Sequence, residues 1–243
     1  MKVVIIVQAR MTSTRLPGKI LLPVLGKPLL EYQIERLKRC NKADDIVIAT
    51  TINASDDVLV EKAKQWGVGC YRGNEEDVLS RYCEASASFG ADAIVRITSD
   101  CPLIDPAVVD RVINAFIAHP KRYDYVSNVL HRTYPRGMDT EVVSAATLLK
   151  VAQLTHEPRF REHVTAFIYQ NPEMFQIHGV EFDRDESRHR WTVDTIEDFE
   201  LMRRILEALY PTNPMFSLEE IIKLIAFHPD WVLINEKVEQ KKV

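Results

Sequence analysis

The chain has 243 residues, of which 46% are hydrophobic and 27% charged, and its 31 Lys and Arg against 35 Asp and Glu give a net charge of −4. This composition is typical of a globular protein with a substantial core. Because no stretch approaches about eighteen consecutive apolar residues and no basic face recurs beyond the N-terminal segment, we expect neither a membrane span nor a nucleic-acid partner.

The first apolar run, Val3–Val7, is too short for the core of a signal peptide and is interpreted as a buried strand. The cysteines are widely spaced and include no CxxC pair, so they indicate neither a zinc site nor a redox motif. Scattered thiols of this kind predict a reducing, cytoplasmic location. The cysteines are Cys40, Cys70, Cys83 and Cys101.

The first thirty residues hold five basic side chains and no Asp or Glu, so the remainder of the chain carries a net charge of −9. In the loop that follows the first strand, hydroxyl residues and backbone N–H groups can face phosphate oxygens. Arg10 and Arg15 can fork onto those oxygens, and Lys19 adds a point charge. The segment therefore predicts a site for a polyanion such as a nucleoside triphosphate. The alternative is a solvated basic loop.

Short apolar runs alternate with amphipathic segments over the first half of the chain. This alternation predicts βαβ units and an open α/β sheet. Asp105 followed by Pro106 predicts a helix start, and the Gly67–Gly73 segment is interpreted as a turn. Strands are predicted at Val3–Val7, Ile46–Ala49 and Ala93–Ile97. Helices are predicted at Leu29–Leu37, Val58–Trp66, Val78–Phe89 and Val108–Ile117.

After about residue 120 the strands are no longer interleaved regularly with helices, so antiparallel additions to the sheet are expected. Capping residues predict two final helices, one from Thr195 to about Leu209 and one from Ser217. The polar tail after Asn235 is expected to fray. Strands are predicted at Tyr123–Leu130, Met138–Val143, Gln176–Phe182 and His189–Val193, and helices near Ser144–Leu154 and Arg161–Gln170. No linker is evident, so a single domain over 1–243 is expected.

Three ordered blocks resemble the sugar cytidylyltransferases, the enzymes that make CMP-KDO and CMP-sialic acid. They are ARMTSTRLPGK at Ala9–Lys19, RITSDCPLID at Arg96–Asp105 and WTVDTIEDF at Trp191–Phe199. Two further segments, GNEEDVLSRY at Gly73–Tyr82 and REHVT at Arg161–Thr165, are similar to the subgroup of the spore coat polysaccharide biosynthesis protein SpsF. The resemblance implies a three-layer α/β/α nucleotide-diphospho-sugar transferase (GT-A-like) fold. Its sheet would be mostly parallel, with antiparallel additions.

The same resemblance implies a Mg²⁺-dependent nucleotidyltransferase that activates a sugar, expected to be acidic, with CTP. A sugar hydroxyl or phosphate would attack the α-phosphate and release pyrophosphate. The resemblance also implies a homodimer, with residues 123–193 serving the dimer interface or the acceptor sugar. Cell-surface or spore coat polysaccharide biosynthesis would use the product.

Asp100 and Asp194 are the predicted metal ligands. Asp100 follows a predicted parallel strand, and ligands of open α/β sheets bind outside the carboxyl ends of strands. A carboxylate there can hold Mg²⁺ against phosphate oxygens. The alternative for Asp100 is a cap on the turn into Pro102. Asp194, which the resemblance makes the partner ligand, could instead be a helix N-cap, although Thr195 can also cap.

The predicted nucleotide-binding residues fall in the N-terminal loop, with one on a helix. Arg81 lies four residues after Asp77, so an ion pair within the helix is the simpler interpretation of that arginine. The predicted set is Gln8, Ala9, Arg10, Ser13, Arg15, Lys19 and Arg81, of which Arg10, Arg15 and Lys19 are expected to act in catalysis.

Asp139, Glu141 and His163 are the predicted sugar-binding residues. Asp139 and Glu141 would face the same side of a strand, where they could bind sugar hydroxyls or a second metal, or simply be solvated. His163 could contact the sugar, transfer a proton or be structural.

Two other functions remain open. In a GT-A-like glycosyltransferase, the DxD pair Asp183 and Asp185 would be essential, although this segment is interpreted as a loop. The other is a non-catalytic nucleotide-binding subunit, although the presence of Arg10, Arg15, Lys19, Asp100 and Asp194 together speaks against it.

Overall fold

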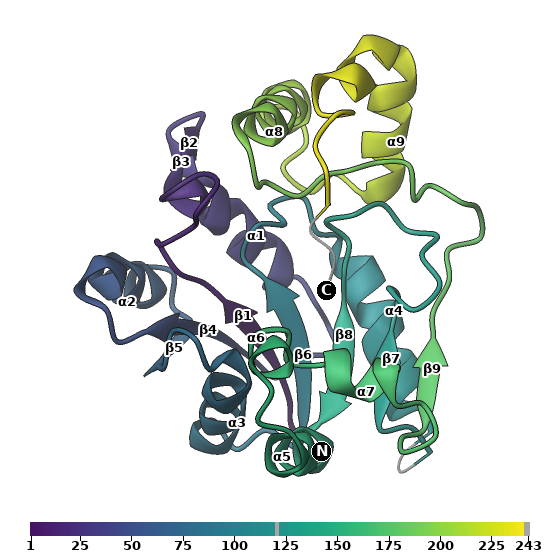
Figure 1. Ribbon diagram of the computed structural model, residues 1–243. Coiled ribbons are helices and arrows are strands. Elements are labelled where there is room, and N and C mark those ends of the chain that lie inside the picture. Colours follow the sequence, from purple (N-terminus) through teal and green to yellow (C-terminus); the bar gives the residue numbers. More distant parts are fainter. Residues whose placement is uncertain (120–121, 241–243) are drawn as a thin grey trace.

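The computed structural model describes residues 1–119 and 122–240, and its centre is a seven-stranded sheet (Figure 1). The strands are β1 (Val3–Gln8), β2 (Pro23–Val24), β3 (Lys27–Pro28), β4 (Asp45–Thr51), β5 (Gly69–Gly73), β6 (Ala93–Thr98), β7 (Tyr125–Ser127), β8 (Glu141–Ser144) and β9 (Ile177–Gly179). The sheet order is β5-β4-β1-β6-β8-β7-β9, and β2 and β3 form a separate hairpin. Strands β5, β4, β1 and β6 run parallel, whereas β8 is antiparallel to both β6 and β7. The expected antiparallel additions are therefore confirmed.

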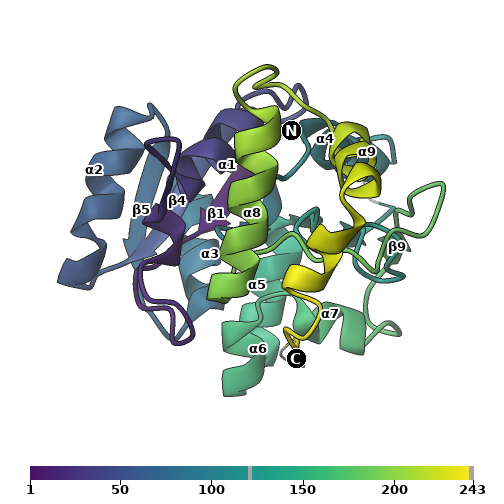
Figure 2. The ribbon, with the colours of Figure 1, turned by 90° about the horizontal axis from the view of Figure 1, so that it is seen from above.

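Helices cover both faces of this sheet, as Figure 2 shows from above. The helices are α1 (Leu29–Leu37), α2 (Asp57–Gln65), α3 (Val78–Ser88), α4 (Pro106–Ile117), α5 (Ala145–Leu154), α6 (Pro158–Glu162), α7 (Ala166–Gln170), α8 (Ile196–Leu209) and α9 (Leu218–Phe227), with short 3-10 helices η1 (Lys19–Leu21), η2 (Ala54–Asp56) and η3 (Pro229–Ile234). Helices α1, α2 and α4 pack on one face, and α3 and α5 pack on the other. This confirms the three-layer α/β/α fold.

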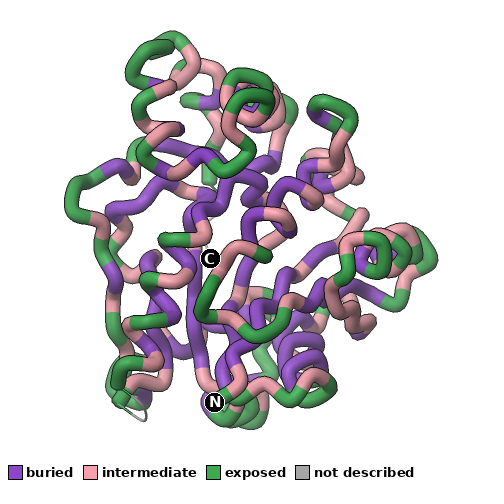
Figure 3. Tube along the Cα trace, turned by 180° about the vertical axis from the view of Figure 1, so that it is seen from behind, coloured by how far each residue is buried: buried purple, intermediate pink, exposed green. Residues whose placement is uncertain are grey.

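The central strands are apolar on both sides because both sides are buried. Along β1, Ile5 and Val7 pack beneath α1, while Val4 and Ile6 pack beneath α3. Seen from behind in Figure 3, the tube is buried through the central strands and exposed mainly in the outer turns and helices. None of the helices described here is both long and apolar enough to cross a membrane.

Helices α8 and α9 lie beyond the edge of the sheet where β6 ends (Figure 1). They form a third apolar cluster with Trp191 and Phe216. Both helices begin with the predicted capping residues: Thr195 and Asp198 form one capping box, and Ser217 and Glu220 the other. The capped α8 fixes the position of the residues just before it, Trp191–Asp194, at the carboxyl edge of the sheet.

Two predictions about which segments form strands of the sheet were wrong. The segment interpreted as a turn at Gly67–Gly73 contains β5, which pairs with β4 as a half-exposed edge strand and therefore lacks a continuous apolar run. The strand predicted at His189–Val193 does not join the sheet. Its backbone instead hydrogen bonds to the loops at Arg136 and Asp100, because it passes above the carboxyl edge.

Three further boundaries differ from the prediction. The helix predicted at Arg161–Gln170 is divided into α6 and α7, because Val164 adopts a left-handed conformation with φ of 50°. Strand β8 begins only at Glu141, so Asp139 lies outside it and the two do not share a strand face. The tail expected to fray packs onto the fold over its described part, since Gln240 accepts a hydrogen bond from Arg190. Its residues 241–243 lie outside the described residues.

Replacing Gly137 with Ala is expected to destabilise the fold by about 2–3 kcal/mol. Gly137 has φ of 100°, and an added Cβ would lie 2.3 Å from the carbonyl oxygen of Trp191, so backbone must shift. The matched control is Gly26→Ala, where φ is 79° but no atom lies within 4 Å of the added Cβ. That change should cost only the backbone strain, about 1 kcal/mol. Thermal unfolding of both variants tests this, and equal losses would contradict it.

Candidate active site at the carboxyl edge of the sheet

The basic loop between β1 and η1 is held in place by hydrogen bonds that its backbone amides donate. The Met11 amide donates to the Asp56 carboxylate at 2.8 Å, and the Gly18 amide donates to the Met11 carbonyl at 3.0 Å. Gly18 has φ of 69°, a conformation that glycine adopts at little cost and that turns the chain into η1. The turn directs Lys19 back over the end of the sheet.

Lys19 lies between Asp100 and Asp194. Its Nζ is 3.3 Å from Asp100 Oδ2 and 2.8 Å from Asp194 Oδ1. Asp194 Oδ2 also forms an ion pair with Arg15 at 2.8 Å and accepts a hydrogen bond from Arg190 at 2.7 Å. Because Thr195 provides the helix cap, the Asp194 carboxylate is left to face these cations. The structure therefore brings together the loop cations and both predicted metal ligands.

Lys19, Asp100 and Asp194 form what we call the junction, and the charges there shift the pKa of Lys19 and of Asp194. Burial alone would lower the pKa of Lys19, but the adjacent Asp100 and Asp194 raise it above its ordinary value. Burial would raise the pKa of Asp194, but Lys19, Arg15 and Arg190 lower it. Both groups therefore stay charged at neutral pH, and Lys19 occupies the space where a metal ion could contact two carboxylates.

Two cavities meet at this junction. The cavity on the side of the basic loop has a volume of about 300 Å³, and the other has a volume of about 550 Å³. The first is lined by all the predicted nucleotide-binding residues, namely Gln8, Ala9, Arg10, Ser13, Arg15, Lys19 and Arg81. The second is lined by the predicted sugar-binding residues Asp139, Glu141 and His163. Both are lined by Arg96, Thr98, Asp100, His163, Asp194 and Gln240.

The cavity on the side of the basic loop is lined by residues whose polar atoms do not all have hydrogen-bond partners within the described part of the protein. Within the described chain, three residues that line this cavity have a buried polar atom without a hydrogen-bond partner: Gln8 Oε1, Arg81 Nε and Arg96 Nε. Buried polar groups are normally paired, so such atoms favour a polar ligand or ordered water.

The predicted Asp77–Arg81 ion pair was wrong. Asp77 caps α3 and pairs with Arg161 at 2.6 Å, and Arg81 donates to the Asn74 carbonyl.

In the second cavity the two carboxylates have different environments. Asp139 accepts both hydrogen bonds of the Arg132 fork, at 2.6 and 3.0 Å. Glu141 is buried and pairs with Arg96, so much of its hydrogen-bonding capacity is used inside the protein. The Asp139 side chain is 36% exposed and that of Glu141 only 7%, so Asp139 is the more accessible of the two carboxylates to a ligand in this cavity.

Two arginines of the site were missed at the sequence level. Arg190 binds both Asp194 and Asp198, and Arg96 pairs with Glu141 across neighbouring strands. Arg96 carried a usable signal, since a charged residue in the middle of a buried strand needs a partner. Arg190 carried no such signal, because its contacts with Asp194 and Asp198 form only when the segment passes above the carboxyl edge of the sheet.

The DxD pair lies away from both cavities. Asp183 pairs with Arg111 at 3.2 Å, and Asp185 accepts a hydrogen bond from the Ser187 amide. This places the pair in a loop, as expected, where each carboxylate already has a partner. Among the residues described, no cluster of three or more His, Cys, Asp or Glu is placed to hold a metal ion.

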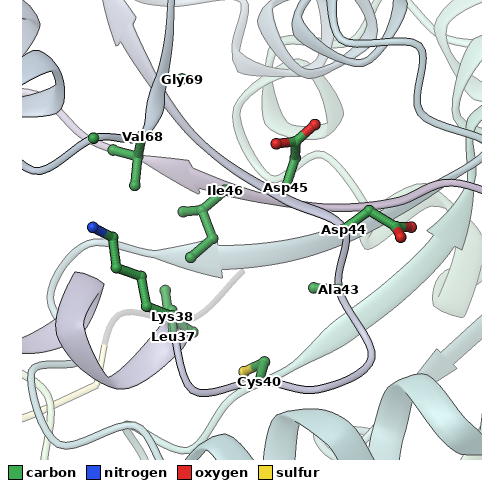
Figure 4. A pocket seen from close by; sticks show the side chains of 10 residues that line it. Leu37, Lys38, Cys40, Ala43, Asp44, Asp45, Ile46, Val68 and Gly69 are labelled. Atoms are coloured by element: carbon green, nitrogen blue, oxygen red, sulfur yellow. The ribbon is translucent and has the colours of Figure 1, made fainter.

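A separate cavity of about 250 Å³ lies at the amino ends of β4 and β5, opposite the junction (Figure 4). Its charged residues have partners within the protein: Asp45 pairs with Lys2 at 2.7 Å, Asp44 accepts from the Val3 amide, and Lys38 donates to the Trp66 carbonyl. It is therefore not part of the candidate active site.

Comparison with known proteins shows which family and which structures the chain resembles. The profile of the cytidylyltransferase family matches residues 4–243. The chain is 32% identical to the spore coat polysaccharide biosynthesis protein SpsF of Bacillus subtilis, over 94% of this chain and 95% of that protein. A cytidylyltransferase structure from Leptospira borgpetersenii is 35% identical and covers 100% of both chains with a TM-score of 0.92. The structure of CMP:2-keto-3-deoxy-manno-octonic acid synthetase complexed with CTP shares the fold, with a TM-score of 0.67, 20% identity, and coverage of 86% of this chain and 99% of that one.

Proposed function

Because this chain belongs to the cytidylyltransferase family, we propose that it activates a sugar with CTP to give a CMP-sugar and pyrophosphate. The observation that carries the proposal is the junction of Lys19, Asp100 and Asp194, where a cavity lined by the basic loop adjoins a second cavity. A transferase of this kind must hold the nucleotide and the acceptor on opposite sides of one phosphorus atom.

The reaction requires in-line displacement at the α-phosphorus. The acceptor oxygen forms a bond to phosphorus, the bond to the β-phosphate oxygen breaks, and the electron pair leaves on pyrophosphate. When the acceptor is a hydroxyl its proton must also leave, and His163 lines both cavities, where an imidazole can accept it.

The cations of the basic loop would stabilise the departing pyrophosphate. Arg15 and Lys19 now neutralise Asp194, at 2.8 Å each. Arg10 is only weakly engaged, with its guanidinium 3.4 Å from Glu75. Triphosphate oxygens could take over all three cations, which would bring fixed positive charge to the position where negative charge develops in the transition state.

Asp100 and Asp194 fit a magnesium ion. Their carboxylates already share one cation, the Lys19 ammonium, and carboxylate oxygens are the ligands that Mg²⁺ prefers. When bound, Mg²⁺ would neutralise phosphate charge at the α-phosphorus. Lys19 must then move from between the carboxylates, so we expect CTP and Mg²⁺ to bind more tightly together than separately.

The acceptor cavity favours an acidic sugar. Burial and the nearby Arg132 lower the pKa of Arg136, and within the described residues no carboxylate forms an ion pair with it. A cation in this position is stabilised by an anionic ligand. The names of SpsF and of the 2-keto-3-deoxy-manno-octonic acid synthetase are consistent with polysaccharide biosynthesis and an acidic sugar, respectively.

Replacing Arg136 with Ala is expected to raise the KM for an acidic sugar by about 10–100-fold and to leave the affinity for CTP unchanged, because a charge-assisted contact to the acceptor is lost. The control is Arg188→Ala, since the Arg188 side chain is 72% exposed and lines only a neighbouring cavity. Steady-state kinetics would measure both variants. An unchanged KM in the Arg136 variant would contradict the assignment.

A panel of the four ribonucleoside triphosphates and candidate acidic sugars, read by pyrophosphate release with Mg²⁺, tests the function. We expect turnover with CTP and an acidic sugar only. Turnover that survives Asp100→Ala would refute the metal assignment, and transfer from a nucleotide sugar without pyrophosphate release would favour a glycosyltransferase. Nucleotide binding without any turnover would favour a non-catalytic subunit.

We further propose that the protein is cytoplasmic and that each chain is a single domain over 1–243. Two chains would form a homodimer, in which residues 123–193 serve the dimer interface or the acceptor sugar. The product would be used in cell-surface or spore coat polysaccharide biosynthesis. A monomeric mass by light scattering would contradict the dimer.

A further inference from the structure

The segment from Glu236 to Gln240 returns to the carboxyl edge of the sheet after η3. In Figure 1 the yellow segment that follows α9 descends toward the centre of the molecule. Asn235 anchors it: this residue is buried, and its side-chain amide donates to the Arg190 carbonyl at 2.9 Å and to Asp198 Oδ1 at 2.8 Å. The segment is therefore attached to the start of α8, beside Asp194.

Two contacts join this segment to the cations that hold Asp194. The Glu239 carbonyl accepts a hydrogen bond from Arg15 at 3.5 Å, and Gln240 Oε1 accepts one from Arg190 at 2.5 Å. Arg15 and Arg190 also contact the same oxygen of Asp194, at 2.8 and 2.7 Å. Gln240 thus belongs to the hydrogen-bond network of the junction, although it lies far from Asp194 in the sequence.

Gln240 lines both cavities of the site as well as a third one beneath the segment. Arg190 can only donate hydrogen bonds, so the oxygen of the Gln240 amide must face it. The amide nitrogen, which carries two donors, therefore points away from Arg190. In the described part of the chain no acceptor is hydrogen bonded to it.

We propose that Gln240 contacts the substrate: its amide nitrogen donates a hydrogen bond to a phosphate oxygen of the nucleotide at the junction, and Arg190 holds the amide in that orientation. The proposal rests on the proposed function, because it takes the anion between the two cavities to be the triphosphate of CTP. It assigns a substrate contact to a residue outside all the motifs that indicated the site.

Gln240→Glu separates this role from a purely structural one. A glutamate would keep an oxygen facing Arg190, and so would preserve the anchor, but it would replace the donor with a negative charge directed at phosphate. We expect the affinity for CTP, titrated by calorimetry with Mg²⁺ and without sugar, to fall by about 10–100-fold. Gln240→Ala, which removes both the anchor and the donor, should lose about 3–10-fold. The control is Glu239→Ala, because only the backbone carbonyl of Glu239 contacts Arg15.

Unchanged CTP affinity in Gln240→Glu, with the wild-type protein binding CTP, would overturn the proposal and leave the proposed function intact. Loss of affinity in Gln240→Ala alone would show that the residue only anchors Arg190. A wild-type protein that binds no CTP would instead overturn the proposed function, and the Gln240 contact with it.

Discussion

Replacing Asp194 with Asn is expected to lower kcat for CMP-sugar formation by about 10³-fold. Asp194 is the only described residue whose carboxylate contacts Arg15, Lys19 and Arg190 together. The amide keeps the size of the side chain but removes the charge that would hold the metal ion and organise these cations. The loss should therefore appear in turnover.

Binding of CTP without metal should respond in the opposite direction. In the Asp194→Asn variant Arg15 and Lys19 lose a competing carboxylate, so metal-free CTP should bind as tightly as to the wild-type protein, or a few-fold more tightly. Calorimetry in the presence of a chelator measures this affinity, and pyrophosphate release measures turnover. A parallel loss of metal-free CTP affinity and turnover, in a variant that keeps the wild-type Tm, would contradict the assigned role.

Asp183→Asn is the matched control for this substitution. Asp183 belongs to the DxD pair and is 85% exposed, and its carboxylate contacts Arg111 away from both cavities. We expect its kcat to stay within about two-fold of the wild-type value, because surface substitutions away from a site have small effects. A large loss at Asp183 with none at Asp194 would favour the glycosyltransferase instead.

Replacing Glu141 with Gln is expected to destabilise the protein by about 4 kcal/mol and to lower Tm by about 10 °C. The Glu141 carboxylate is buried and pairs with Arg96, and it accepts hydrogen bonds from Tyr125 at 2.5 Å and Thr165 at 2.6 Å. The amide leaves the buried Arg96 without a countercharge, which costs more than the lost attraction alone. Calorimetric or dichroism melts measure the shift.

The difference in Tm between the wild-type protein and the Glu141→Gln variant should depend on pH. Burial alone would raise the pKa of Glu141, but Arg96, Thr165 and Tyr125 lower it below its ordinary value. A carboxyl group whose pKa is lower in the folded state contributes stability above its unfolded pKa, near 4.5, and loses that contribution as the pH falls through the folded value. The Tm difference should therefore be constant from neutral pH to about pH 5 and shrink at lower pH.

Glu207→Gln is the control for charge removal at an exposed site. Glu207 pairs with Arg203 at 2.8 Å, but both side chains are more than a third exposed. Exposed ion pairs contribute at most about 1 kcal/mol, so its Tm should change by only a few degrees. Similar losses in the two variants would contradict the importance of burial at Glu141.

The elements predicted best are those whose signals are local. The apolar run in β1 is read directly from neighbouring residues, since a strand buried on both faces needs apolar side chains throughout. The N-caps at Asp105, Thr195 and Ser217 were also confirmed, because a cap bonds only to amides two or three residues away. Edge strand β5 was missed because its half-exposed residues carry no such pattern.

The sequence by itself indicated the basic loop, Asp100 and Asp194, and the structure places all of them around one cavity, but the sequence did not indicate Arg96, Arg190 or Gln240. Their tertiary arrangement was decided only by the fold. Lys19 lies between the two carboxylates because β1, β6 and α8 converge at one edge of the sheet. That convergence depends on strand order and helix packing, which residues distant in sequence create together and no local pattern records.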